Sequence, residues 1–228
     1  MKIIFHGHAC TEIQTTGAKI IIDPWLRENP LSDISPEHIT PAYILLTHGH
    51  YDHFGDTVEI ALSCGSTVIA PSELAKFCSS QGLRAIVMNQ GGWLTLPGIR
   101  IKMVRADHSS SIKSPDGNIY AGLAAGYIIE ADGKKIYHAG DTALFSDMSL
   151  IGSCGLDVAL LPIGDTVTMG AEDAAEAARL LKARIVIPIH YNSFPAICCN
   201  PEEFKELMRY RTPECECRIL SPGDQLTL

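Results

Sequence analysis

The sequence lacks an excess of basic residues and has no long apolar run. Its 18 lysines and arginines stand against 26 aspartates and glutamates, a net charge of −8 with no long block of one sign. The overall field therefore repels polyanions, and nucleic acid is not expected as a partner. No apolar stretch approaches the ~18 residues that a membrane helix needs, so no membrane association is expected.

The sequence also lacks the cysteine spacing of a disulfide framework. Its eight cysteines are scattered and include the adjacent pair Cys198–Cys199, which favours free thiols. Cys215 and Cys217 could clip a metal ion, but no second pair stands at zinc-finger spacing. The apolar run near Met1 is too short for a signal peptide, so a cytoplasmic location is expected.

With 228 residues, of which 46% are apolar, the chain can bury one sizeable core, and we expect a single domain over residues 1–228. Hydrophobic periodicity predicts a mixed α/β fold. The expected strands are 2–6, 10–15, 19–23, 67–70, 85–88, 93–96, 100–106, 121–130, 134–138, 158–162 and 185–189, and the expected helices are 56–63, 72–82, 143–152, 172–182 and 201–211. Residues 24–42 are expected to form an active-site wall, and residues 107–118 a mobile lid.

The stretch from Thr47 to His53 holds three histidines and one aspartate directly after the apolar run Ile44–Leu46. Imidazole is a weak turn former but the commonest metal-ligating side chain. His48 and His50 leave the backbone on the same side and can hold one ion, while Asp52 and His53 can face a second. The motif therefore predicts a site for two metal ions.

Four ligands cannot complete two coordination spheres, so further ligands are expected at the ends of later strands. His108, Asp141 and His190 each stand just after an apolar run. Loops at strand ends commonly carry function on a rigid scaffold. These residues are our candidates for completing the site.

The pattern H-x-H-x-D-H, followed by a distant His, Asp and His, resembles the signature of the metallo-β-lactamase superfamily. Flanking stretches resemble a metal-dependent hydrolase branch that is similar to the ascorbate-6-phosphate lactonases. These stretches are Gly7-His8, Ile22–Trp25, His138–Thr142, Thr168–Gly170 and His190–Asn192. The resemblance covers the whole chain and implies a four-layer αββα sandwich.

The resemblance also implies how the ligands divide between the ions. His48, His50 and His108 would hold the first ion, Asp52, His53 and His190 the second, and Asp141 would bridge both. Such ligands suit Zn²⁺, with Mn²⁺ or Fe²⁺ as alternatives. Flavin-partnered diiron relatives carry Glu where this chain has His50, which argues against a redox role.

The implied chemistry is hydrolysis of a small ester, lactone or phosphodiester by a hydroxide held between the ions. Asp52 is the candidate catalytic residue, because its carboxylate can orient that hydroxide. Two dications, two carboxylates and one hydroxide sum to +1, so an anionic small molecule could be accepted. Lys113 could meet such an anion.

Four further residues are candidates for supporting the site or binding substrate: His8, His138, Tyr191 and Asn192. His8 and His138 are expected to contact ligand side chains rather than an ion. Tyr191 and Asn192 follow the ligand His190 and could donate hydrogen bonds to substrate or serve the fold alone. His6 is expected to be structural and His38 solvated.

Two other functions use the same residues. A ribonuclease or tRNA-processing nuclease shares the ligand set but needs a basic arm, which is not visible here. A non-catalytic metal-binding scaffold or ligand sensor would keep the fold, although such proteins usually lose ligands. The sequence leaves the oligomeric state open, and a homo-oligomer is possible.

Overall fold

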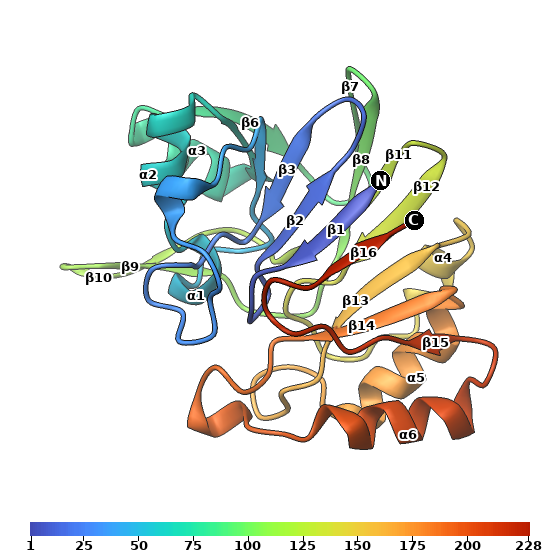
Figure 1. The fold of residues 1–228 in the computed structure, drawn as a ribbon. Helices are drawn as coiled ribbons and strands as arrows, with labels where there is room; N and C mark the ends of the chain where they lie inside the picture. Colours follow the sequence, from blue (N-terminus) through green and yellow to red (C-terminus); the bar gives the residue numbers. More distant parts are fainter.

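The computed structural model describes residues 1–228, which form two β-sheets packed face to face with helices on the outer faces (Figure 1). Each large sheet has seven strands. This confirms the mixed α/β fold that periodicity predicted and the four-layer αββα sandwich that the family resemblance implied.

The first sheet combines an antiparallel meander with a parallel half, in the order β16-β1-β2-β3-β4-β5-β6. Its strands are β1 (Lys2–Phe5), β2 (Thr11–Gln14), β3 (Lys19–Ile22), β4 (Tyr43–Leu45), β5 (Thr67–Pro71), β6 (Arg84–Met88) and β16 (Gln225–Thr227). Strands β3 to β6 run parallel. Their carboxyl ends therefore meet at one edge of the sheet, where the polar motif begins.

The second sheet has the order β15-β14-β13-β12-β11-β8-β7. Its strands are β7 (Trp93–Leu96), β8 (Ile99–Arg105), β11 (Ala125–Ala131), β12 (Lys134–His138), β13 (Val158–Pro162), β14 (Ile185–Ile189) and β15 (Glu216–Cys217). Strands β12 to β15 are parallel, and β7, β8, β11 and β12 are antiparallel neighbours. Strands β8, β12 and β14 end just before the predicted ligands His108, Asp141 and His190.

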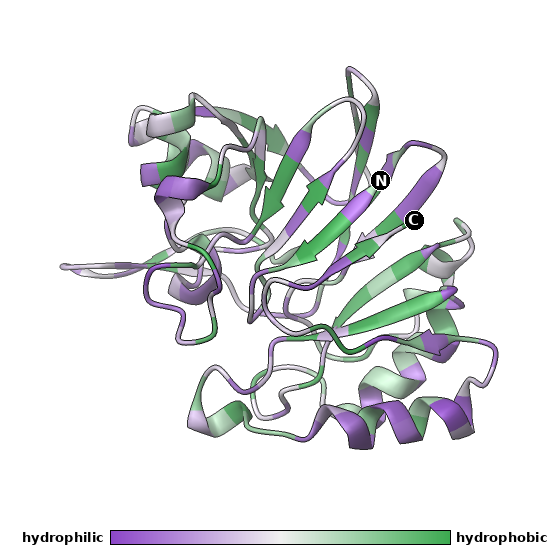
Figure 2. Ribbon diagram, in the orientation of Figure 1, coloured by the Kyte–Doolittle hydropathy of each residue, from purple (hydrophilic) through white to green (hydrophobic).

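Three apolar clusters hold the layers together. The central one lies between the sheets and includes Ile13, Ile20 and Tyr127. The helices α2 (Thr57–Cys64) and α3 (Ser72–Ser80) cover the first sheet through a second cluster. The second sheet is covered through the third cluster by α4 (Met148–Gly152), α5 (Ala171–Leu181) and α6 (Pro201–Arg211). Figure 2 shows hydrophobic residues along the strands and hydrophilic residues on much of α6.

Tyr127 ties the two sheets together near the motif. Its ring is fully buried, and its hydroxyl lies 2.7 Å from the carbonyl oxygen of Leu46 and 3.3 Å from that of Ile69. The hydroxyl belongs to strand β11 of the second sheet, whereas both carbonyls belong to the first. A buried tyrosine commonly satisfies its hydroxyl in this way, and here the bond fixes the backbone directly before Thr47.

One expectation differs from the structure, and two local features were not foreseen. Where a lid loop was expected at 107–118, β9 (Ser111–Ser114) and β10 (Gly117–Tyr120) form a separate hairpin. The motif itself contains a short helix, α1 (Tyr51–Phe54). Asp56 precedes α2 but does not cap it with its side chain; its carboxylate instead accepts hydrogen bonds from the backbone of Leu26 and Arg27. Asp56 therefore anchors the wall over residues 24–42.

Two elements near the end of the chain were not predicted, and one helix is shorter than expected. Strands β15 and β16 are two and three residues long, too short to carry a periodic pattern. Helix α4 begins at Met148 rather than near residue 143. No helix combines the length and the apolar character that crossing a membrane requires.

His6 connects the meander to the wall. Its Nδ1 lies 2.8 Å from Asp33 Oδ1, and its Nε2 lies 3.7 Å from Glu12 Oε2. Burial opposes the charged imidazolium, but the two carboxylates outweigh it and raise the pKa of His6. The stabilisation is therefore complete below the unfolded pKa of about 6.5 and is lost as the pH rises through the folded value.

We expect His6→Gln to lower the free energy of unfolding more at pH 6 than at pH 9, because only the protonated ring gains from both carboxylates. Urea unfolding of wild type and variant at the two pH values measures the difference. His38→Gln, at an exposed position, is the control and should show no such trend. An equal loss at both pH values would contradict the charged pairing.

Candidate metal centre

Seven predicted ligands meet at one edge of the sandwich, where strand ends of both sheets come together. From the first sheet, the chain leaves β4 through His48 and His50 and enters α1, which carries Asp52 and His53. From the second sheet come the residues after β8, β12 and β14, which are His108, Asp141 and His190. The fold thus places ligands from distant parts of the chain around one space.

His48, His50 and His108 form one group of nitrogen atoms. His50 Nδ1 lies 3.0 Å from His48 Nε2 and 3.3 Å from His108 Nε2. Nitrogens bound to a tetrahedral zinc ion at 2.0–2.1 Å are about 3.4 Å apart. The spacing of these three rings therefore suits one ion.

A second group contains Asp52, His53 and His190, and it also includes His8. Asp52 Oδ2 lies 3.2 Å from His8 Nε2 and 3.9 Å from His190 Nε2. His8 is thus as close to the carboxylate as the expected ligand is. Its Nε2 therefore belongs to the same group of possible ligand atoms as Asp52, His53 and His190.

The carboxylate of Asp141 lies between the two groups. Its Oδ2 is 3.0 Å from His190 Nε2 and 3.6 Å from His108 Nε2, and its Oδ1 is 3.3 Å from His53 Nε2. One side chain therefore faces nitrogen atoms of both groups. This is the position that a bridging ligand would need.

The residues present fit bound metal ions, because several of their buried polar atoms have no hydrogen-bond partner. These atoms are His8 Nε2, His53 Nε2, Asp141 Oδ1, and Nδ1 and Nε2 of His190. An unsatisfied buried polar atom costs about 1–3 kcal/mol, so such atoms are rare unless a ligand or ion uses them. Both the donor types and their convergence suit a divalent cation.

Asp23, at the end of β3, orients two of the ligands. Its fully buried carboxylate accepts hydrogen bonds from Thr47 N at 2.8 Å, Thr47 Oγ1 at 2.6 Å and His53 Nδ1 at 2.8 Å. Because the Thr47 hydroxyl donates to Asp23, it can accept from His48 Nδ1, 3.0 Å away. Both imidazoles are left with Nε2 toward the centre, the usual arrangement around a metal.

Sequence reasoning gave Asp23 no role, although a carboxylate directly after the apolar run 20–22 was a usable signal. A buried carboxylate at that point requires hydrogen-bond donors. Those partners come from Thr47 and His53, which lie 24 and 30 residues away. Sequence spacing alone does not reveal them.

His138 supports the backbone rather than a ligand side chain. Its Nδ1 accepts a hydrogen bond from Gly140 N at 3.2 Å, and its Nε2 donates to the Ala9 carbonyl at 3.0 Å. Both ring nitrogens are therefore occupied. The ring links the residues next to Asp141 and His8, two side chains of the centre.

Tyr191 and Asn192 do not line the cavity beside the centre. Tyr191 packs against the cluster under α5 and α6, and burial raises the pKa of its hydroxyl to about 12. Asn192 Oδ1 accepts a hydrogen bond from Cys199 N at 2.8 Å. Both side chains therefore contact other parts of the fold rather than the cavity.

The charges of the centre depend on one another. Burial alone would raise the pKa of Asp141, but His190 and His53 hold it well below its usual range. Burial, with the neighbouring His53, lowers the pKa of His48 well below its usual value. For His53, burial is outweighed by Asp141 and Asp23, which raise its pKa. The two imidazoles are thus shifted in opposite directions by their different neighbours.

A cavity of about 590 Å³ opens beside the centre. Five of the candidate metal-site residues line it: His50, Asp52, His108, Asp141 and His190. The rest of the lining includes polar residues, among them Ser109, Ser111 and Asn118, and apolar residues, among them Val167, Phe194 and Ile197. A molecule in this space would contact the centre directly.

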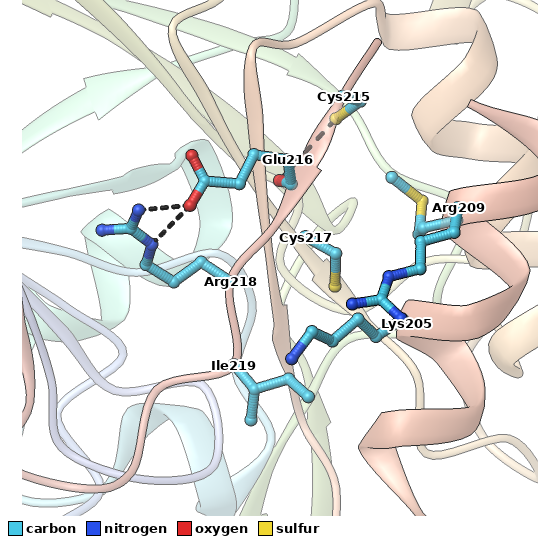
Figure 3. Close-up of a pocket in the computed structure, with 8 residues that line it drawn as sticks. Lys205, Arg209, Cys215, Glu216, Cys217, Arg218 and Ile219 are labelled. Atoms are coloured by element: carbon cyan, nitrogen blue, oxygen red, sulfur yellow. Dashed lines mark hydrogen bonds and ion pairs between the residues drawn. The ribbon is translucent and has the colours of Figure 1, made fainter. Parts of the chain in front are cut away.

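A separate cavity of about 430 Å³ lies between α6 and β15 (Figure 3). It contains Cys215 and Cys217, the pair considered as a metal clip. Neither thiol belongs to a group of three possible ligands. Burial raises the pKa of Cys215 to about 12 and that of Cys217 to about 11. These thiols and the other six cysteines are free, as the sequence predicted.

Comparisons with known proteins agree with this geometry. The family model described as "Beta-lactamase superfamily domain" matches residues 2–190. The chain is 46% identical over 230 residues to a UPF0173 metal-dependent hydrolase of Anoxybacillus flavithermus, covering all of both chains. A UPF0173 metal-dependent hydrolase of Geobacillus thermodenitrificans is 47% identical over 230 residues, again covering all of both chains.

Among solved structures, the chain is similar to Igni18, a metallo hydrolase from the hyperthermophilic archaeon Ignicoccus hospitalis. The TM-score is 0.89 at 36% sequence identity, with 99% of this chain and 97% of that chain covered. The same assignment is supported by full-length relatives, by a matching fold and by a convergent set of possible metal-ligating side chains. The chain belongs to the β-lactamase superfamily and is a metal-dependent hydrolase.

Proposed function

We propose that this hydrolase uses two divalent ions, most simply Zn²⁺ with Mn²⁺ or Fe²⁺ as alternatives, to cleave a small ester, lactone or phosphodiester. The observation that carries the proposal is the convergence of seven ligand side chains, several with unpartnered buried atoms, beside an open cavity. His48, His50 and His108 would hold one ion, and Asp52, His53 and His190 the other. Asp141 would contact both.

When bound, the ions would lower the pKa of a water from ~15.7 toward ~7 and polarise the scissile carbonyl or phosphoryl group. Asp52 is the residue that orients the attacking water, because its carboxylate lies at the cavity wall. Burial opposes its ionisation, but His8 and His53 hold the pKa of Asp52 well below its usual range. The side chain thus stays a hydrogen-bond acceptor at neutral pH.

His8 supports Asp52 in this role. Its Nδ1 lies 2.5 Å from Ser193 Oγ while its Nε2 faces Asp52, so the ring is held from both sides. Burial, reinforced by the nearby His190, lowers the pKa of His8 to about 4. With Nδ1 occupied by Ser193, the neutral ring keeps Nε2 3.2 Å from Asp52 Oδ2 without adding charge. His8 thus limits the orientations open to the Asp52 carboxylate.

The size of the cavity supports a small substrate. Its volume of about 590 Å³ falls within the ~300–1,000 Å³ typical of small-molecule sites. A net charge of −8 works against a long polyanion, which would gain little free energy from counterion release on this surface. The ribonuclease alternative is therefore less well supported.

We expect turnover of bis(p-nitrophenyl) phosphate or of a simple lactone, and weak or no cleavage of structured RNA. The measurement is a panel of lactones, phosphodiesters and a tRNA precursor, assayed with zinc and with manganese at physiological salt. Efficient, salt-sensitive cleavage of the tRNA precursor, with no activity on the small substrates, would favour the nuclease. A metal-replete protein that is inactive on all three would favour a ligand sensor.

Protein purified without chelator should contain close to two transition-metal ions per chain, because seven ligands can hold two open sites and would crowd one. Elemental analysis by inductively coupled plasma mass spectrometry gives the ratio. A value that stays at or below one under metal-replete conditions would exclude the dinuclear arrangement.

Asp141→Ala should reduce activity far more than His138→Ala, because only Asp141 faces both ligand groups. Because His138 acts only through the backbone beside Asp141 and His8, its loss should cost at most the roughly 10- to 100-fold seen for direct partners of metal ligands. Kinetics at saturating zinc, with circular dichroism to confirm folding, make the comparison. If His138→Ala abolished metal binding and Asp141→Ala did not, the assignment would be wrong.

A further inference from the structure

The hairpin of β9 and β10 is built next to the metal centre but belongs to neither large sheet. It begins three residues after His108 and extends away from the body of the molecule (Figure 1). A two-stranded hairpin is marginally stable by itself. Its position must therefore be fixed where it meets the rest of the protein.

That contact is made with the motif loop at Gly49. A Cβ atom at Gly49 would lie 2.8 Å from Ala121 Cβ and 3.0 Å from Ile112 Cγ1, so only glycine allows this approach. Gly49 N also donates a hydrogen bond to Ser110 Oγ at 3.1 Å. The base of the hairpin is thus held directly against the segment that carries His48 and His50.

The pleat of the hairpin gives its two faces different roles. Ile112 points into the core and is buried. Lys113 is paired directly with Asn118 across the two strands, so their side chains share the opposite face. Both residues line the cavity of the metal centre, together with Ser111.

Lys113 brings an unpaired positive charge to this cavity. It is the only lysine or arginine among the lining residues. The lysines that form ion pairs are Lys134 and Lys205, and Lys113 is not among them. Asn118 and Ser111 line the same cavity, and their amide and hydroxyl groups can also donate hydrogen bonds. These groups together suit an anionic oxygen group.

A different wall of the cavity is apolar. It is formed by Val167 and by Phe194, Ala196 and Ile197 of the segment after β14. Phe194 is supported from behind by Trp25, whose ring stacks on it at a centroid distance of 5.2 Å. The cavity therefore offers a metal centre, a cationic hairpin and an apolar wall to one molecule.

We infer that Lys113 and Asn118 form an anion subsite, separate from the metal centre, that selects substrates carrying a carboxylate or phosphate group. The substrate class is then a small ester or lactone with an anionic group at the hairpin and an apolar part against Phe194. The inference rests on the proposed function and specifies its substrate. Lys113 is a specificity-determining residue, because its contact lies away from the bond that is cleaved.

The test compares two esters that differ mainly in charge: mono-4-nitrophenyl glutarate, which carries a free carboxylate, and the neutral 4-nitrophenyl butyrate. In zinc-loaded enzyme, Lys113→Gln should raise KM for the glutarate ester about 10-fold, with kcat little changed, the size expected for loss of one charge-assisted hydrogen bond. KM for the butyrate ester should change less than about 2-fold. Lys113→Arg should keep most of the preference. Lys205→Gln, which removes a lysine from the other cavity (Figure 3), is the charge control and should change neither value.

Binding of glutarate and of methyl phosphate, measured by calorimetry on the zinc-loaded protein, separates this inference from the proposed function. If neither ester is cleaved, the proposed ester chemistry fails, and the titrations alone decide on the subsite. Weaker binding of either anion by Lys113→Gln, with Lys205→Gln unchanged, would support it, and the anion affected identifies the group. Equal binding by both variants and wild type, or an equal rise in KM for the two esters, would overturn it.

Discussion

The fully buried carboxylate of Asp23 is the interaction on which the metal-binding edge depends. It accepts three hydrogen bonds, from the backbone and side chain of Thr47 and from His53. An ionised carboxylate inside a protein is costly unless it is fully paired, so these bonds fix both the end of β3 and the chain after β4. The orientation of His53, and through Thr47 that of His48, follows from this one group.

In the sandwich, apolar and polar residues occupy different parts of the strands. The middle of each strand supplies the dry core between the sheets, and the strand ends supply the polar cluster. Such a cluster is unfavourable on its own, because imidazoles and carboxylates lose water without gaining enough partners. The core provides the stability that allows these unsatisfied atoms to persist, and a cation would satisfy them.

The mixed α/β class and the candidate ligands were predictable from local patterns, whereas the four-layer sandwich came from the family resemblance. The motif from His48 to His53 is contiguous, and His108, Asp141 and His190 each follow a clear apolar strand. The structure brings these seven side chains together, and their division between two ions stays a prediction. The roles of Asp23 and His8 depend instead on contacts with residues distant in sequence, such as Ser193, which lies 185 positions from His8.

The hairpin at 111–120 was taken for a loop because its Ser, Asp, Gly and Pro content is typical of loops. Its strands are only four residues long, and Ile112 is the main sign of a buried face. Tyr191 and Asn192 were candidates for substrate contact only because they follow His190. The direction of a side chain just beyond a strand depends on the backbone turn, and Asn192 adopts a positive φ of 60°.

The hydrogen bonds of Tyr127 have a mechanical consequence for the enzyme. The hydroxyl joins a strand of the second sheet to the carbonyls of Leu46 and Ile69 in the first, directly before the motif. The sheets cannot slide or separate here without breaking a buried bond. At the opposite strand ends, Asp132 of the second sheet bonds to Thr16 and to the amino group of Met1 in the first, so the sandwich is tied at both ends and ligands from the two sheets are held in a fixed relation.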